Sequence, residues 1–172
     1  MRVIPAACLL LAACTTSPEF LAAERLNENP APVHAMLAAT TVKSYSRAHG
    51  TQIEYLAPDG RSFLLYPGNR MILPGEWQIR GSGPIKGEMC FRYGANTYNP
   101  VTGARGSAWE CGFLTDYLVY NDEIRDGDIL NLSRRTQPPA RLPKGVNLTI
   151  AQVQAMWGLP PTDAPNKSIA PR

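Results

Sequence analysis

The sequence predicts a mainly β fold: a small antiparallel barrel or sandwich of about seven or eight short strands, with short helices at its N- and C-terminal ends. Proline and glycine account for 16 and 14 of the 172 residues, a composition typical of short strands joined by turns. From Thr40 onward, apolar and β-branched segments alternate with turn sequences. Closure into a barrel is favoured because it removes unpaired strand edges, and a sandwich is the alternative.

Two short helices are predicted before the strands. Ser17-Pro18-Glu19 combines a helix cap, a first-turn proline and an acidic residue near the positive end of the helix dipole. This helix is expected to end before Asn29-Pro30, and a second helical segment follows over residues 33–39. Residues 14–32 are interpreted as a tether, and residues 33–158 as one β-rich globular domain.

The clearest hairpin lies near the start of this domain. Residues 52–56 alternate polar and apolar side chains, Pro58-Asp59-Gly60 supplies a turn, and residues 61–66 return along the first arm. An earlier strand is expected to begin at Thr40.

Further strands are predicted from the later turn sequences. Residues 71–73 and 76–80 are expected to be separate strands on either side of a Pro74-Gly75 turn. Residues 117–120 and 129–132 are expected to form a last hairpin around Asp126-Gly127-Asp128.

The C-terminal residues predict one helix and a tail. Thr149 and Gln152 have the spacing of a capping box, and Gly158 is a typical helix stop. A closing helix is therefore expected over residues 150–157. Residues 159–172 are polar and proline-rich and are expected to be a disordered tail.

The N-terminus has the pattern of an exported chain. A positive Met1-Arg2 precedes an apolar run, residues 3–11, that is too short to span a bilayer as a helix. Leu11-Ala12-Ala13-Cys14 then supplies an aliphatic residue, two small residues and a thiol. This box resembles the signal of bacterial lipoproteins, and Cys14 fits it better than Cys8, which would put proline at the aliphatic position.

The lipoprotein resemblance implies removal of residues 1–13 as a signal peptide, and lipidation of Cys14 by a thioether-linked diacylglycerol and an acylated amino group. Two or more acyl chains suffice for stable anchoring. Thr15, where an aspartate would favour the inner membrane, implies the periplasmic face of the outer membrane. Ordinary secretion is the alternative.

Cys90 and Cys111 are predicted to form a disulfide, which an oxidising periplasm permits. They lie in two strand-like segments, residues 88–93 and 108–113, that flank a loop. If the loop is symmetric, residues equally far from its centre face each other, which places the two cysteines opposite one another. A metal site is the alternative, but no Cys-x-x-Cys spacing supports it.

Composition excludes several classes of function. Removal of Arg2 leaves 16 basic and 14 acidic residues with no basic block, so no nucleic-acid partner is expected. The two histidines, His34 and His49, lie in no metal or triad motif, and no serine-hydrolase or phosphate-loop motif occurs. No catalytic residue, metal or cofactor is assigned. A calcium site is the alternative to ordinary turn chemistry for four acidic residues: Asp122, Glu123, Asp126 and Asp128.

Aromatic residues indicate a candidate binding surface. Strand aromatics usually pack in a core, whereas Tyr98 lies in the loop and is expected to be exposed. Arg92 is expected to face Trp109 across the cysteine-bearing pair and to stack on its ring. Tyr98, Trp109 and Arg92 are therefore the candidate surface for an envelope protein or a glycan.

Thr41, Gly50 and four short motifs lie within roughly residues 36–113. The motifs are Tyr55-Leu56-Ala57-Pro58-Asp59-Gly60, Gly75-Glu76-Trp77, Cys90-Phe91-Arg92-Tyr93 and Trp109-Glu110-Cys111. Together they resemble a family of small exported bacterial proteins of unknown function. That resemblance implies no activity and no catalytic residues. Gly75-x-Trp77 also resembles the opening strand of lipocalin-like barrels, which favours a small barrel.

Three functional hypotheses follow. The first is a non-enzymatic binding or structural lipoprotein of the envelope. The second is an inhibitor of lysozyme-type hydrolases that inserts residues 94–106 into the enzyme. The third is a glycan hydrolase, whose acid–base pair would need two carboxyl groups about 5–9.5 Å apart, drawn from Glu76, Glu88, Glu110 and Asp116.

Overall fold

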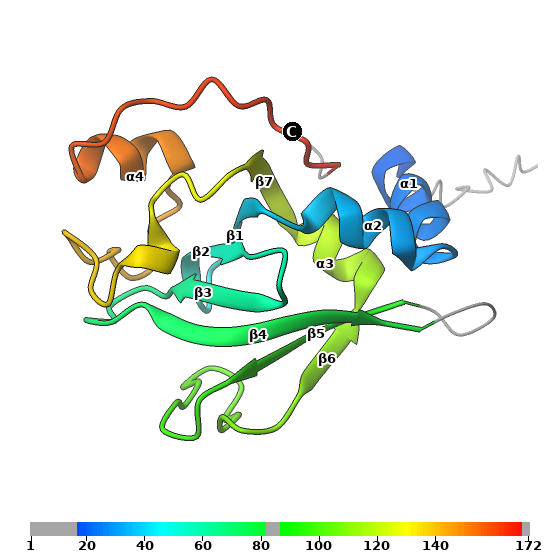
Figure 1. Cartoon of the computed structure of the whole chain (residues 1–172), viewed down its shortest axis with the longest axis horizontal. Coiled ribbons are helices and arrows are strands. Elements are labelled where there is room, and N and C mark those ends of the chain that lie inside the picture. The colour runs from blue at the N-terminus through cyan, green and yellow to red at the C-terminus, as the bar shows by residue number, and fades with distance from the viewer. Residues whose placement is uncertain (1–16, 82–86, 170–172) are drawn as a thin grey trace, which may run out of the picture.

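The computed structural model describes residues 17–81 and 87–169. It confirms the mainly β fold. Seven antiparallel strands form one sheet in the order β6-β5-β4-β3-β2-β1-β7, which curls like half of a barrel (Figure 1). The strands are β1 (Thr40–Ser46), β2 (Gly50–Leu56), β3 (Arg61–Leu65), β4 (Leu73–Arg80), β5 (Glu88–Tyr93), β6 (Glu110–Phe113) and β7 (Asn121–Asp126).

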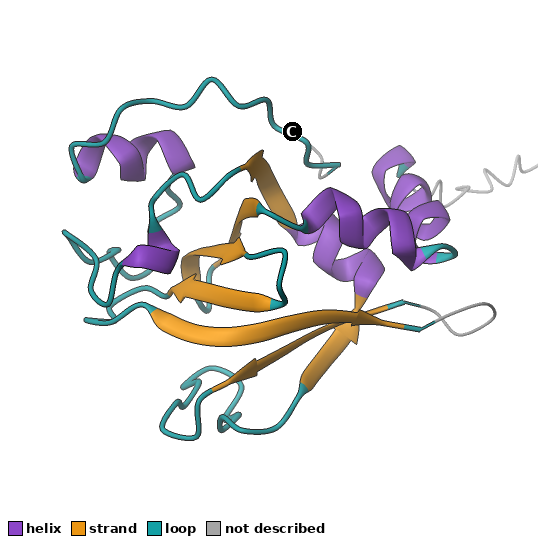
Figure 2. Ribbon diagram, viewed as in Figure 1, coloured by secondary structure: helices purple, strands orange, loops and turns teal. Residues whose placement is uncertain are grey.

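Short helices pack against this sheet in two groups (Figure 2). The N-terminal group contains α1 (Pro18–Asn27), α2 (Pro30–Leu37) and α3 (Leu114–Tyr120). The second group contains the 3-10 helix η1 (Leu132–Arg134) and α4 (Ile150–Met156). None of the helices in residues 17–81 and 87–169 has the length and apolar character needed to cross a membrane.

Each face of the sheet carries its own hydrophobic core. On one face, Leu56, Trp77 and Met89 pack with buried residues of α1, α2 and α3. On the other, Ile53 and Leu65 pack with buried residues of η1 and α4. Successive side chains of a strand point to opposite faces, so the central strands are covered on both sides.

The hairpin predicted around Pro58-Asp59-Gly60 is confirmed as β2 and β3. Gly60 adopts a φ of +85°, a left-handed conformation that glycine tolerates best. Asp59 Oδ1 accepts a 3.1 Å hydrogen bond from the backbone N–H of Arg61. Local turn chemistry therefore sets this register.

The first helix begins as predicted, because the Ser17 side chain accepts a hydrogen bond from the N–H of Phe20. The segment differs from the predicted tether, however. α1 packs against α3, and Ala23 is fully buried. Residues 18–32 therefore belong to the globular domain. Cys14 and the rest of the predicted signal lie outside the described residues.

Two predicted strand assignments are corrected. Pro74-Gly75 is no turn: both residues lie within the continuous strand β4 and pair with β3. Residues 117–120 are helical in α3, and residues 129–132 form no hairpin arm with them. The last strand is instead β7, which pairs with β1 and places Thr40 opposite Asp126.

The C-terminal helix is confirmed: Thr149 and Gln152 form the capping box of α4. Residues 159–169 differ from the predicted disordered tail, since they return to the sheet and run beside β7 (Figure 1). The Asn166 amide accepts from the N–H of Ile124 and donates to the carbonyl of Asp122, both at 2.9 Å. The N–H of Lys167 donates to the Ile124 carbonyl at 2.8 Å. This segment thus occupies the outer edge of β7, which none of the seven described strands covers.

Candidate functional site

The predicted disulfide is confirmed. Cys90 and Cys111 face each other in the β5–β6 pair, with Cα atoms 4.1 Å apart. That distance is characteristic of a non-hydrogen-bonded antiparallel pair. Cys90 is fully buried and Cys111 is exposed.

The predicted stacking of Arg92 on Trp109 is also present. The Arg92 guanidinium carbon lies 4.8 Å from the centre of the Trp109 ring, and that of Arg80 lies 5.1 Å from it. Arg92 also forms an ion pair with Glu76 on the neighbouring strand. Two guanidinium groups from β4 and β5 therefore lie close to the Trp109 ring.

The structure does not bring Tyr98 to this cluster. Tyr98 is 56 % exposed, as expected, but it lines a cleft together with Tyr93. Arg92 and Tyr93 are adjacent in β5, so their side chains point to opposite faces of the sheet. The predicted surface is therefore divided into an Arg92–Trp109 cluster on one face and Tyr98 on the other.

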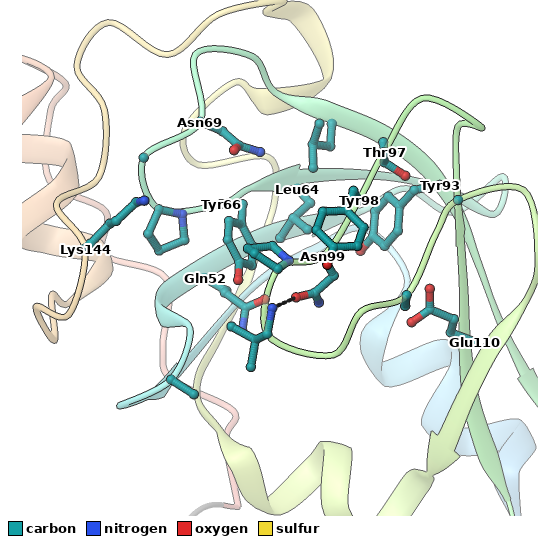
Figure 3. A pocket seen from close by; sticks show the side chains of 18 residues that line it. Gln52, Leu64, Tyr66, Asn69, Tyr93, Thr97, Tyr98, Asn99, Glu110 and Lys144 are labelled. Atoms are coloured by element: carbon teal, nitrogen blue, oxygen red, sulfur yellow. Dashed lines mark hydrogen bonds between the residues drawn. The ribbon is translucent and has the colours of Figure 1, made fainter.

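The cleft around Tyr98 has a volume of about 410 Å3 and is shown in Figure 3. Its walls come from strands β2 to β6 and from two loop segments, residues 66–69 and 94–106, with Ala48 and Lys144 from two further loops. It lies on the same face of the sheet as the α1–α3 core, because Gln52 and Tyr93 share the strand alternation of Leu56 and Met89. The size is within the range of small-molecule sites, about 300–1,000 Å3.

Three tyrosines dominate the cleft: Tyr66, Tyr93 and Tyr98. The Tyr66 hydroxyl and His49 Nδ1 lie 2.9 Å apart and share a hydrogen bond. The cleft is also lined by the polar side chains of Gln52, Asn69, Thr97 and Asn99. Its charged lining residues are Glu110 and Lys144. Such a mixture of aromatic rings and a few polar groups is typical of ligand-binding sites.

The loop wall of the cleft is held in one conformation by its own backbone. A Cβ atom at Gly106 would lie 1.9 Å from the carbonyl oxygen of Gly94, so only glycine fits where the loop closes. Asn99 Oδ1 accepts a 3.0 Å hydrogen bond from the N–H of Val101 (Figure 3) and a 3.3 Å hydrogen bond from the N–H of Thr102. This wall is therefore preformed.

A buried carboxyl group lies beneath the cleft. The Tyr93 hydroxyl donates a 2.9 Å hydrogen bond to Glu54 Oε1, and Glu54 is only 7 % exposed. Burial raises the pKa of Glu54 from 4.5 to about 7, against the opposing effect of the Ser62 and Tyr93 hydroxyls. Burial, followed by the nearby Glu54 charge, also raises the pKa of Tyr93 and of Tyr117 well above 10.0.

Gly75 makes this arrangement possible. A Cβ atom at this position would lie 2.7 Å from Cδ1 of Tyr93, which is too close for an unstrained contact. The missing side chain thus leaves room for the Tyr93 ring over β4. Two residues later, Trp77 enters the core of the same face and donates a 2.8 Å hydrogen bond to the Ala57 carbonyl. This explains the Gly75-x-Trp77 motif in physical terms.

No motif in the sequence singles out Glu54. Its position in an alternating strand is typical of a solvent-facing polar residue. Burial of both faces of β2 depends on helices and strands distant in sequence, so the alternation alone could not find it.

The carboxylates predicted for a glycan hydrolase are not brought together. Glu110 lines the cleft. Glu76 and Glu88 share the sheet face of Arg92, and Asp116 lies on α3. No pair among these four residues forms an acid–base site in the cleft.

The four acidic residues considered for calcium have separate partners. Asp122 accepts a 2.7 Å hydrogen bond from the Lys43 ammonium, whose side chain is only 2 % exposed. Asp128 accepts from the N–H groups of Leu132 and Ser133, at 2.7 and 2.9 Å, which confirms its role in a turn. The remaining contacts are Glu123 with Arg125 and Asp126 with Lys167.

Within residues 17–81 and 87–169, one cluster has the ligand spacing of a metal site: Glu88, Cys90 and Cys111. Both sulfur atoms of that cluster are joined in the disulfide. The disulfide therefore accounts for this cluster without a metal ion.

Comparisons with family models, with curated proteins and with solved structures gave no match for the chain. The lipoprotein signal and the resemblances stated above therefore stay predictions.

Proposed function

We propose that this chain is an outer-membrane lipoprotein, anchored through Cys14 on the periplasmic face, whose β domain is a non-enzymatic binding module. The observation that carries the binding role is the 410 Å3 cleft, with three tyrosine side chains and a preformed loop wall. The Leu-Ala-Ala-Cys box supports the anchor. The dispersed carboxylates favour binding over catalysis.

In-cell photocrosslinking tests the binding role. A benzophenone amino acid at Tyr98, in the cleft, should give covalent adducts in intact cells. The matched control carries the same group at Tyr120, which is 68 % exposed but does not line the cleft. The proposal fails if the two positions give the same background and deletion of the protein leaves the envelope unchanged.

The anchor is tested separately. The parent chain should incorporate labelled fatty acid and co-fractionate with the outer membrane. Cys14→Ala should abolish both properties, whereas Cys8→Ala should change neither. Fatty-acid labelling that persists in Cys14→Ala would disprove lipidation at this residue.

The lysozyme-inhibitor hypothesis requires the loop over residues 94–106 to enter a foreign enzyme. Seven loop residues instead line the chain's own cleft, which favours the binding module. A lysozyme activity assay with the purified protein distinguishes the two, since the proposed function expects no inhibition.

A further inference from the structure

Two charged side chains lie on opposite sides of the cleft, Lys144 and Glu110 (Figure 3). Neither forms an ion pair among the residues that the structure describes. Glu110 lines the cleft from β6, the strand next to the one that carries Tyr93. The cleft thus offers one cationic and one anionic end.

The position of Lys144 is set by a glycine. A Cβ atom at Gly68 would lie 2.7 Å from Cε of Lys144, so the lysine stem crosses the open space above that glycine. The backbone holds the two segments together, since the N–H of Gly68 donates a 3.0 Å hydrogen bond to the carbonyl of Leu142. The ammonium group is therefore placed at the rim of the cleft.

Between the two charges lie tyrosine rings and free amide groups. The side chains of Gln52 and Asn69 form no hydrogen bond to other described residues, so their donors and acceptors are available to a ligand. These amide groups in the cleft wall disfavour an acyl chain, because an apolar ligand packed on them would leave them unpaired. A sugar ring satisfies both features: its C–H face packs on tyrosine, and its hydroxyls pair with amides.

We propose that the cleft binds a pyranose sugar that carries a carboxylate, with the acidic group at Lys144 and the ring between Tyr66 and Tyr98. Glu110 accepts a hydrogen bond from a hydroxyl or amide N–H at the other end of the ligand. The volume of about 410 Å3 is at the small end of ligand sites, so the cleft accommodates one or two sugar rings. This inference rests on the proposed function, in which the cleft is the binding site.

Two sugars that differ by one acidic group test the proposal. N-acetylmuramic acid and N-acetylglucosamine are titrated into the mature chain in detergent micelles, and binding is followed by NMR shifts. The acidic sugar should bind at least about fivefold more tightly at low salt, and added salt should reduce the difference. Lys144→Met keeps the stem over Gly68 but removes the charge, so the two affinities should become nearly equal. Lys167→Met, outside the cleft, should keep the preference.

Tyr98→Ala should weaken the binding of both sugars by about tenfold or more, with an unchanged thermal midpoint as evidence of folding. A preference that persists in Lys144→Met, or equal binding of the two sugars by the parent chain, would overturn the assignment of the acidic group. If neither sugar binds while crosslinks at Tyr98 still form in cells, the sugar proposal fails and the binding module stands. If both experiments are negative, the proposed function fails as well.

Discussion

The Tyr93 hydroxyl donates a 2.9 Å hydrogen bond to Glu54 Oε1 across the backbone of Gly75. This contact links the floor of the cleft to the interior of the domain. It keeps a carboxyl group buried beside a neutral phenol, in an environment that favours the protonated acid.

The stability of the protein should depend on pH through Glu54. Its pKa is raised to about 7 from 4.5, so the folded chain holds this proton more tightly than the unfolded chain. The stabilising contribution is therefore complete below pH 4.5 and is lost as the pH rises to about 7. The free energy of unfolding should fall by about 3 kcal/mol over this range from this group alone.

Urea unfolding between pH 4.5 and pH 8 measures this dependence, with Glu54→Gln as the test variant. The parent chain should lose stability across the range relative to Glu54→Gln. Glu76→Gln, which removes an exposed carboxylate paired with Arg92, should follow the parent. Parallel curves for the parent and Glu54→Gln would show that burial of Glu54 does not set the pH dependence.

Gly75→Ala should destabilise the fold by about 1–3 kcal/mol, because the added Cβ is forced against the Tyr93 ring and the Arg92 carbonyl. Gly112→Ala is the matched control, since its Cβ would meet nothing within 4 Å. Urea midpoints compare the two variants. A loss for Gly112→Ala as large as that for Gly75→Ala would contradict the packing argument.

The Cys90–Cys111 disulfide closes a loop with a sequence separation of 21 residues. The chain-entropy estimate for a loop of this size is about 3 kcal/mol. A Cys90→Ala, Cys111→Ala double variant should lose roughly that amount in the free energy of unfolding. Reduction of the parent should produce a similar loss, while the double variant should be insensitive to reductant. Two free thiols at these positions in the unreduced, denatured parent would exclude the bond.

Asn166→Ala should expose the outer edge of β7. The substitution removes the acceptor for the Ile124 N–H and the donor to the Asp122 carbonyl, at a cost of about 1–3 kcal/mol. Hydrogen exchange at the Ile124 amide should become faster. Asp163→Ala, an exposed position in the same segment, should leave that exchange rate unchanged. Equal protection in both variants would mean that Asn166 does not hold the segment on β7.

Several features followed from local patterns. The Pro58-Asp59-Gly60 turn, the Ser17 cap and the Thr149 capping box depend on residues within three or four positions of each other, so the sequence was enough to predict them. The Cys90–Cys111 register was predictable because the loop between the strands is symmetric. The same register places Arg92 opposite Trp109.

Other features required contacts between distant segments. Residues 117–120 have an apolar pattern that suits a strand, yet they lie in α3, whose buried side chains pack against α1 and the sheet. β7 is a strand because its backbone pairs with the free edge of β1. Residues 159–169 are ordered because they form hydrogen bonds with the outer edge of β7.

The sequence by itself determined the mainly β character, the turns, the caps and the cysteine pair, because each depends on chemistry that neighbouring residues share. The cleft, by contrast, forms only in the tertiary structure. Gly75, Tyr93 and Glu54 lie on β4, β5 and β2, and their arrangement exists only once the sheet order places β4 beside β5 and separates β4 from β2 by the single strand β3. Burial of Glu54, which raises its pKa, is likewise a property of the assembled sheet and its covering helices.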